Sequence, residues 1–150
     1  MKRMYSEEEL LEVSKTENLV DSKGRNRFIV GNGNPGSLSG LTVASTKWTL
    51  NGNNLVFEIL GSFSGDLTGF NILSTFDLPE WVANKIITPA SNIVDILTCL
   101  MISLQDAGGT SIRVQITKSG NTLYFTNAST ITISDPSLFK IRYNIIIDNE

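Results

Sequence analysis

The sequence predicts a mainly β protein, an antiparallel β-sandwich of the jelly-roll kind preceded by a short helix. Apolar and polar residues alternate with period two, most clearly in 111–117 and 139–147. Turn residues separate these runs at short intervals, as in two-sheet sandwiches. The chain has 150 residues, 41% of them hydrophobic and 18% charged, which fits one globular domain of low charge.

Residues 1–27 hold a disproportionate share of the charge, and we expect a helical appendage there for oligomerisation or attachment. Ser6 can cap a helix, and Glu9 completes the capping box three residues later. Leu10 and Leu11 then begin a short apolar stripe. A helix this short is marginal alone and needs a partner, either the rest of the domain or copies of itself. A polar tail is the alternative.

Residues 28–40 are rich in Gly, Asn and Ser and predict a linker, although its first three residues fit a short strand. The head domain then covers 41–150. Its first half is predicted to consist of strands at 41–45, 46–50 and 55–60, a turn at 51–54, a Gly/Ser loop at 61–69 and a strand at 69–78. The residues expected to share one face of the last strand are Phe70, Ile72, Ser74 and Phe76.

The apolar segment 86–104 fits either buried strands or a buried helix, because periodicity alone does not separate the two. Its β-branched residues and the break at Pro89 favour two extended segments. Cys99, the single cysteine, lies in this run and is interpreted as a small buried hydrophobe rather than a reactive thiol. One cysteine excludes an internal disulfide.

The pattern after Gly108 is the clearest in the chain. It predicts strands at 111–117, 121–126, 130–133 and 139–148, with turns at 118–121 and 135–137. In the last strand, Phe139, Ile141 and Tyr143 are expected to face inward.

The composition argues against most catalytic chemistry. The chain has no histidine, which is the commonest general base and zinc ligand. It has no calcium-loop, zinc or phosphate-loop motif, so we expect no cofactor, no metal and no enzymatic activity. Glu58 and Asp95 are the carboxylates that fall within apolar runs. They remain candidates for a carboxylate mechanism, with the solvent face of a strand as the simpler interpretation of Glu58.

Partners are limited by charge and hydropathy. A net charge of −3 gives no electrostatic footprint for nucleic acid. The N-terminus has no apolar signal region, and the apolar run 93–104 is too short to cross a bilayer, so no signal peptide and no membrane insertion are expected. Trp48 and Trp81 are the candidate ligand-binding residues, as platforms for a sugar. Core packing or a subunit contact is the alternative for both.

Three phrases resemble the C-terminal head domains of bacteriophage tail-fibre and receptor-binding proteins: FDLPEWVANKIITP, GGTSIRVQITKSGNTLYFTNASTITISD and FKIRYNIIID. The opening MYSEEELLEV resembles that of small structural or adhesion proteins of phages of Gram-positive bacteria. The resemblance spans about 48–148 and implies a homotrimeric virion protein of fibre or baseplate type. It also implies contacts with other virion proteins, and either binding to a host-surface glycan or decoration of the virion, but no site residue. A monomeric bacterial carbohydrate-binding or adhesion module is the alternative.

Overall fold

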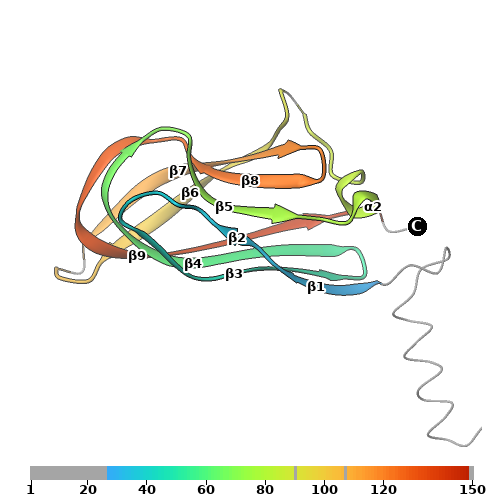
Figure 1. Ribbon diagram of the computed structural model, residues 1–150, viewed down its shortest axis with the longest axis horizontal. Coiled ribbons are helices and arrows are strands. Elements are labelled where there is room, and N and C mark those ends of the chain that lie inside the picture. The colour runs from blue at the N-terminus through green and yellow to red at the C-terminus, as the bar shows by residue number, and fades with distance from the viewer. Residues whose placement is uncertain (1–26, 90, 107, 149–150) are drawn as a thin grey trace, which may run out of the picture.

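The computed structural model describes residues 27–89, 91–106 and 108–148. They form a nearly closed antiparallel sheet in which the strands lie in the order β1-β3-β4-β9-β6-β7-β8-β5-β2 (Figure 1). The strands are β1 (Phe28–Asn32), β2 (Asn34–Pro35), β3 (Leu41–Asn51), β4 (Asn54–Thr68), β5 (Asn71–Asp77), β6 (Ile93–Ser103), β7 (Gly109–Ser119), β8 (Thr122–Asn127) and β9 (Thr130–Ile146). A short helix, α2 (Glu80–Ala83), follows β5. The predicted mainly antiparallel β class is confirmed, whereas the predicted N-terminal helix lies outside the described residues.

Two tight hairpins, one between β3 and β4 and one between β7 and β8, lie where the sequence predicts turns. β3 and β4 are joined by a two-residue loop, with Asn51 paired to Asn54. Gly52, the first residue of this loop, has a φ of +64°, which glycine adopts without steric cost. The loop between β7 and β8 has the same form, since Ser119 pairs with Thr122 and Gly120 has a φ of +59°.

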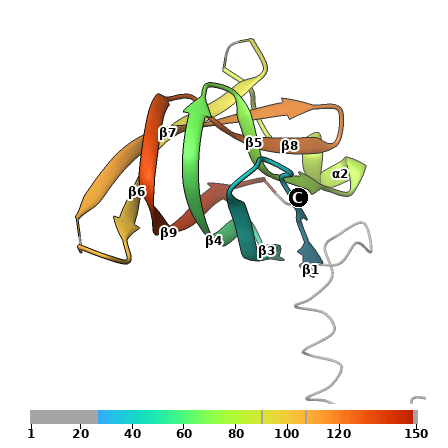
Figure 2. The ribbon, with the colours of Figure 1, turned by 60° about the vertical axis from the view of Figure 1, so that its left-hand side comes forward.

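The sheet folds into two layers because β4 and β9 bend at the same place. Their register shifts between Phe63 and Gly65, so that Ser64 stands opposite residues 134–136. Such a bulge bends a strand and increases its twist. Figure 2 shows both strands rising there from the layer of β1, β3, β4 and β9 to the layer of β6, β7, β8 and β5. The loop predicted at 61–69 and the turn predicted at 135–137 are therefore wrong, because both segments are parts of long bent strands.

One side of the sheet is closed by consecutive short strands. β1 pairs with β3, and β2 pairs with β5 at the other end of the strand order. The Ser74 hydroxyl donates a 3.1 Å hydrogen bond to the Asn34 carbonyl, and its oxygen lies 2.6 Å from the Thr46 hydroxyl, from which it can accept another. Residues 28–40, which the sequence assigns to a linker, thus contain the two strands that close the sheet.

Phenylalanine rings join the two layers of the core. Phe57 of β4, Phe76 of β5 and Phe125 of β8 are fully buried, with ring centroids 5.0 to 5.7 Å apart and tilted or edge-on. This is the geometry that aromatic pairs prefer. Trp48 is also in the core, and its indole covers Gly31 so closely that a Cβ there would lie 2.3 Å from Nε1.

Two further expectations are corrected by local geometry. In β5 the register shifts between Ile72 and Ser74, so Phe70 and Ile72 are exposed while Ser74 and Phe76 are buried. The single face predicted for these four residues is wrong because the bulge reverses the alternation.

Of the two extended segments predicted in 86–104, the second is confirmed as β6. The first is wrong, since Ile86 ends the turn of α2 with a bond from its N–H to the Ala83 carbonyl.

No helix in residues 27–89, 91–106 and 108–148 is long and apolar enough to cross a membrane.

The phenylalanine cluster gives a first prediction. Phe76→Ala removes a fully buried ring and should lower the free energy of unfolding by about 3–5 kcal/mol. For a domain of this size the melting temperature should fall by on the order of 10 °C, measured by circular dichroism. The matched control is Phe70→Ala, since Phe70 is 70% exposed and its loss should change little. Equal destabilisation by both variants would contradict this account of the core.

The closing strands give a second prediction. Ser74→Ala removes a buried hydroxyl, so that the half-buried Thr46 hydroxyl and the Asn34 carbonyl lose the partner they share. Stability in urea should fall by about 1–3 kcal/mol. Ser62→Ala, on the outer side of β4, is the control and should stay within about 0.5 kcal/mol of the original chain. A Ser74 variant as stable as its control would show that these bonds do not hold the sheet closed.

Candidate functional site

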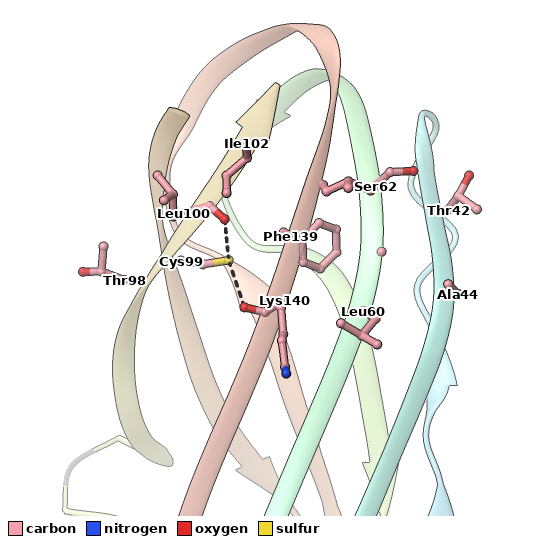
Figure 3. Close-up of a pocket in the computed structure, with 12 residues that line it drawn as sticks. Thr42, Ala44, Leu60, Ser62, Thr98, Cys99, Leu100, Ile102, Phe139 and Lys140 are labelled. Atoms are coloured by element: carbon pink, nitrogen blue, oxygen red, sulfur yellow. Dashed lines mark hydrogen bonds between the residues drawn. The ribbon is translucent and has the colours of Figure 1, made fainter. Parts of the chain in front are cut away.

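An apolar groove crosses the outer face of four adjacent strands, β3, β4, β9 and β6 (Figure 3). Its volume is about 480 Å³. Its large apolar side chains are Leu60 of β4, Leu138 of β9, and Leu100 and Ile102 of β6, all 39–51% exposed. Thr42 and Ala44 of β3 line its other end. We call this set of residues the apolar groove.

Strand periodicity and register bring these side chains together. In β6, Cys99 and Met101 point into the core, so Leu100 and Ile102 point outward. Ile102 pairs with Leu138, which in turn stands opposite Ser62 of β4. Side chains that face each other across strands lie close enough to pack. The groove is therefore a consequence of β6 having apolar residues on both faces.

The groove lies where β6 and β9 separate. These strands pair only from Met101 to Ser103, whereas β6 pairs with β7 from Ile93 onward. Cys99 is next to the point of separation, with its Sγ 3.9 Å from the Leu100 carbonyl oxygen and 4.0 Å from that of Lys140 (Figure 3). Burial raises the pKa of this thiol to about 11, so it stays protonated at neutral pH. Its surroundings are those of a buried hydrophobe, as the sequence predicts.

Tyr143 bridges the two strands farther along. Its hydroxyl donates a 2.9 Å hydrogen bond to Asp95 Oδ2, and Asp95 Oδ1 accepts a 2.7 Å bond from the Ile96 N–H. The Tyr143 ring meets Phe125 edge-on, with centroids 6.3 Å apart. Burial raises the pKa of Tyr143 to about 12, and the hydrogen bond to Asp95 and its charge add to the effect. Asp95, a candidate carboxylate, thus serves to hold β6 to β9.

Glu58, the other candidate carboxylate, lies on the outer face of β4. Its register partners are Lys47 of β3 and Arg142 of β9, so opposite charges flank it on both sides. Neither Glu58 nor Asp95 lines the apolar groove. In the part of the chain that the structure describes, its one charged lining residue is Lys140. Within the described residues no group of three or more Cys, Asp or Glu side chains could hold a metal ion.

The two tryptophans proposed as sugar platforms lie apart from the groove. Trp48 is 4% exposed, so its ring has no free face for a ligand. Trp81 lies in α2, half-buried against the core. Sequence reasoning missed Leu60, Leu100, Ile102 and Leu138. The run ILTCLMISL could have indicated them, because it is apolar at almost every position, so that both faces of this strand carry apolar side chains.

No family model matches the chain, and no curated protein matches it in sequence. Among solved structures, the chain is similar to the distal domain of the mouse adenovirus 2 fibre, with 14% identity and a TM-score of 0.48 over 87% of this chain and 84% of that one. It is also similar to the Ad16 fibre knob, with 13% identity and a TM-score of 0.42 over 89% and 93% of the two chains.

A third similar structure is the bovine atadenovirus type 4 fibre head protein, with 9% identity and a TM-score of 0.34. The match covers 71% of this chain and 96% of that one. The three structures are head or distal parts of viral fibres, from adenoviruses rather than from bacteriophages.

The bond between Tyr143 and Asp95 gives a third prediction, on pH. The pKa of Tyr143 is higher in the folded chain than the usual value of 10. Its contribution to stability is therefore complete below pH 10 and is lost as the pH rises through about 12. In an ultraviolet titration, a late ionisation step should appear near pH 12, and Tyr143→Phe should remove it.

Asp95→Asn separates the causes of this shift. Because burial is the largest cause, the pKa of Tyr143 should fall in this variant but stay above 10. A late step that persists in Tyr143→Phe would assign it to another tyrosine and contradict the account.

Proposed function

We propose that this chain is a virion protein of fibre or baseplate type from a phage or prophage of Gram-positive bacteria. On this proposal it assembles as a homotrimer, attaches to other virion proteins through residues 1–27, and presents its β domain to a host-surface glycan. The sequence resemblance to phage fibre heads supports the class of protein. The observation that carries the proposal is the apolar groove on the outside of the sheet.

The groove belongs to a larger apolar surface along β6. Ile96 is 43% exposed at an outward position of the same strand, and Leu104 is 59% exposed just after its end. Monomeric soluble proteins rarely leave contiguous apolar patches larger than a few hundred Å² exposed, and such patches mark interaction surfaces. We take the partner that covers this surface to be a second copy of the chain, because copies are present wherever the protein is made.

An energy estimate shows what the apolar surface contributes to association between copies. Full burial of an exposed Leu or Ile contributes about 1.5–3 kcal/mol. Six side chains of one copy that are already half covered would then contribute roughly 5–9 kcal/mol, and the surface of the partner copy adds to this. A sum of this size is comparable with the usual cost of association. The choice of a trimer rests on the resemblance to phage fibre heads.

The positions of the chain ends fit attachment at one end. β1 begins and β9 ends at one end of the molecule, whereas the bends of β4 and β9 lie at the other (Figure 1). A domain that is attached through the residues before β1 would therefore point its bent end outward. The alternative of a monomeric module with a tryptophan-lined groove gains no support from Trp48, because its ring is buried.

A fourth prediction tests the assembly. The full chain should elute as a particle of about three times its mass of 16.4 kDa in size-exclusion chromatography with light scattering. Leu100→Asp combined with Leu138→Asp places charges in the groove and should give a monomer, because burying unpaired charges is costly. Its circular dichroism spectrum should be unchanged, since both side chains are about half exposed.

The matched control is Ile87→Asp, which changes an apolar side chain that is 83% exposed and does not line the groove. This variant should remain trimeric. A monomeric unmodified chain at micromolar concentration would contradict the proposal, as would a double variant that stays trimeric.

A further inference from the structure

A second hollow, of about 300 Å³, lies at the bent end of the sheet, next to the apolar groove. Strand β6 separates the two hollows: Ile102 lines the groove, whereas its neighbours Met101 and Ser103 line the second hollow. Its polar side chains are those of Ser103, Asp106, Thr110, Thr132, Ser134, Asp135 and Ser137. We call these seven residues the polar cavity.

The bend of β9 and the turn after β6 build this cavity. Asp135 lies in the stretch 134–136 that breaks the register with β4, and Ser137 pairs with Ser103 across β9 and β6. In the turn, the Asp106 carboxylate accepts a 2.9 Å bond from the Gly108 N–H. This bond and one from Ser103 lower the pKa of Asp106, so it is ionised at neutral pH.

Some of the polar groups in the cavity are already used by the fold. Thr132 donates a 2.6 Å bond to Asp66, and Ser137 donates a 2.9 Å bond to the backbone carbonyl of Asp135. The side chains of Thr110, Ser134 and Asp135 make no hydrogen bond to another described residue. Thr110 and Asp135 are half-buried, whereas Ser134 is exposed. Of these three groups, Asp135 and Thr110 are therefore the two that the surrounding strands partly enclose.

The lining chemistry selects the class of ligand. Carboxylates accept hydrogen bonds from hydroxyl groups, and a threonine hydroxyl can both donate and accept. Met101 and Ile133 are buried and give the cavity an apolar base, which suits the C–H face of a sugar ring. Among the described residues no Lys or Arg lines the cavity, and its two carboxylates would repel an anion.

We propose that the polar cavity binds an uncharged saccharide unit, with Asp135 accepting a hydrogen bond from a sugar hydroxyl and Thr110 bonding a second. This inference rests on the proposed function and sharpens it, because it assigns the glycan site and excludes acidic sugars. The cavity lies at the end of the molecule away from the start of β1, where an attached head would meet a cell surface (Figure 1). It has no aromatic platform, so a single site binds weakly and three sites in one trimer provide avidity.

The test uses the full-length chain on an array of neutral glycans, sialylated glycans and phosphate-bearing glycans. We expect binding to a subset of the neutral glycans. Asp135→Ala and Thr110→Val should each weaken that binding by about tenfold or more, measured as the half-saturating protein concentration. Glu58→Gln is the matched control, since it removes a carboxylate on the outer face of β4 and should leave binding unchanged. Unchanged melting temperatures and unchanged oligomer mass show that the variants fold and assemble.

The other outcomes separate this inference from the proposed function. Binding of neutral glycans that both cavity variants retain would refute the cavity as the site and leave glycan recognition standing. Binding of acidic glycans alone would refute the ligand class. A trimer that binds no glycan would overturn this inference and the glycan part of the proposed function, but not the assembly.

Discussion

The register break between β4 and β9 is the constraint on which the rest of the molecule depends. Ser64 stands opposite three residues of β9, and the extra residues bend both strands at one level. Without this bend the strands would continue as one extended sheet, and Phe57 could not meet Phe76 and Phe125 from the other layer. The phenylalanine cluster then holds the layers together, and Ser74 helps to close the side where β1 and β2 lie.

Both surface hollows follow from the same bend. As β9 turns, it stays paired with β6 over only three residues, from Ser137 to Phe139. On the outer side the apolar residues of β4, β6 and β9 line the apolar groove, while the stretch 134–136, which is out of register with β4, brings Asp135 to the polar cavity. One deformation of the sheet thus creates a surface suited to another copy of the chain and a cavity suited to a hydroxylated ligand. A proposed fibre head needs both features.

The sequence predicted those elements in which alternation is regular. The alternating apolar residues of 111–117 are buried as expected, because that strand has one apolar face. The bend was missed, since the Gly and Ser residues of 61–69 and the Asp-Pro-Ser of 135–137 also occur in loops, and only pairing with a distant strand keeps them extended. The groove could not be predicted from the sequence either, because it depends on the pairing of distant strands. From the sequence, Leu100 looks like a core residue. In the structure its neighbours Cys99 and Met101 are buried, so Leu100 points outward.

The central claim is that another copy of the chain covers the apolar groove. The most direct test places a benzophenone-bearing amino acid at position 138 of the full chain and irradiates it at micromolar concentration. If a second copy covers the groove, cross-linked products should appear at multiples of 16.4 kDa, whereas the same group at position 87 should give none. A chain that stays at its single mass when labelled at position 138 would contradict the claim.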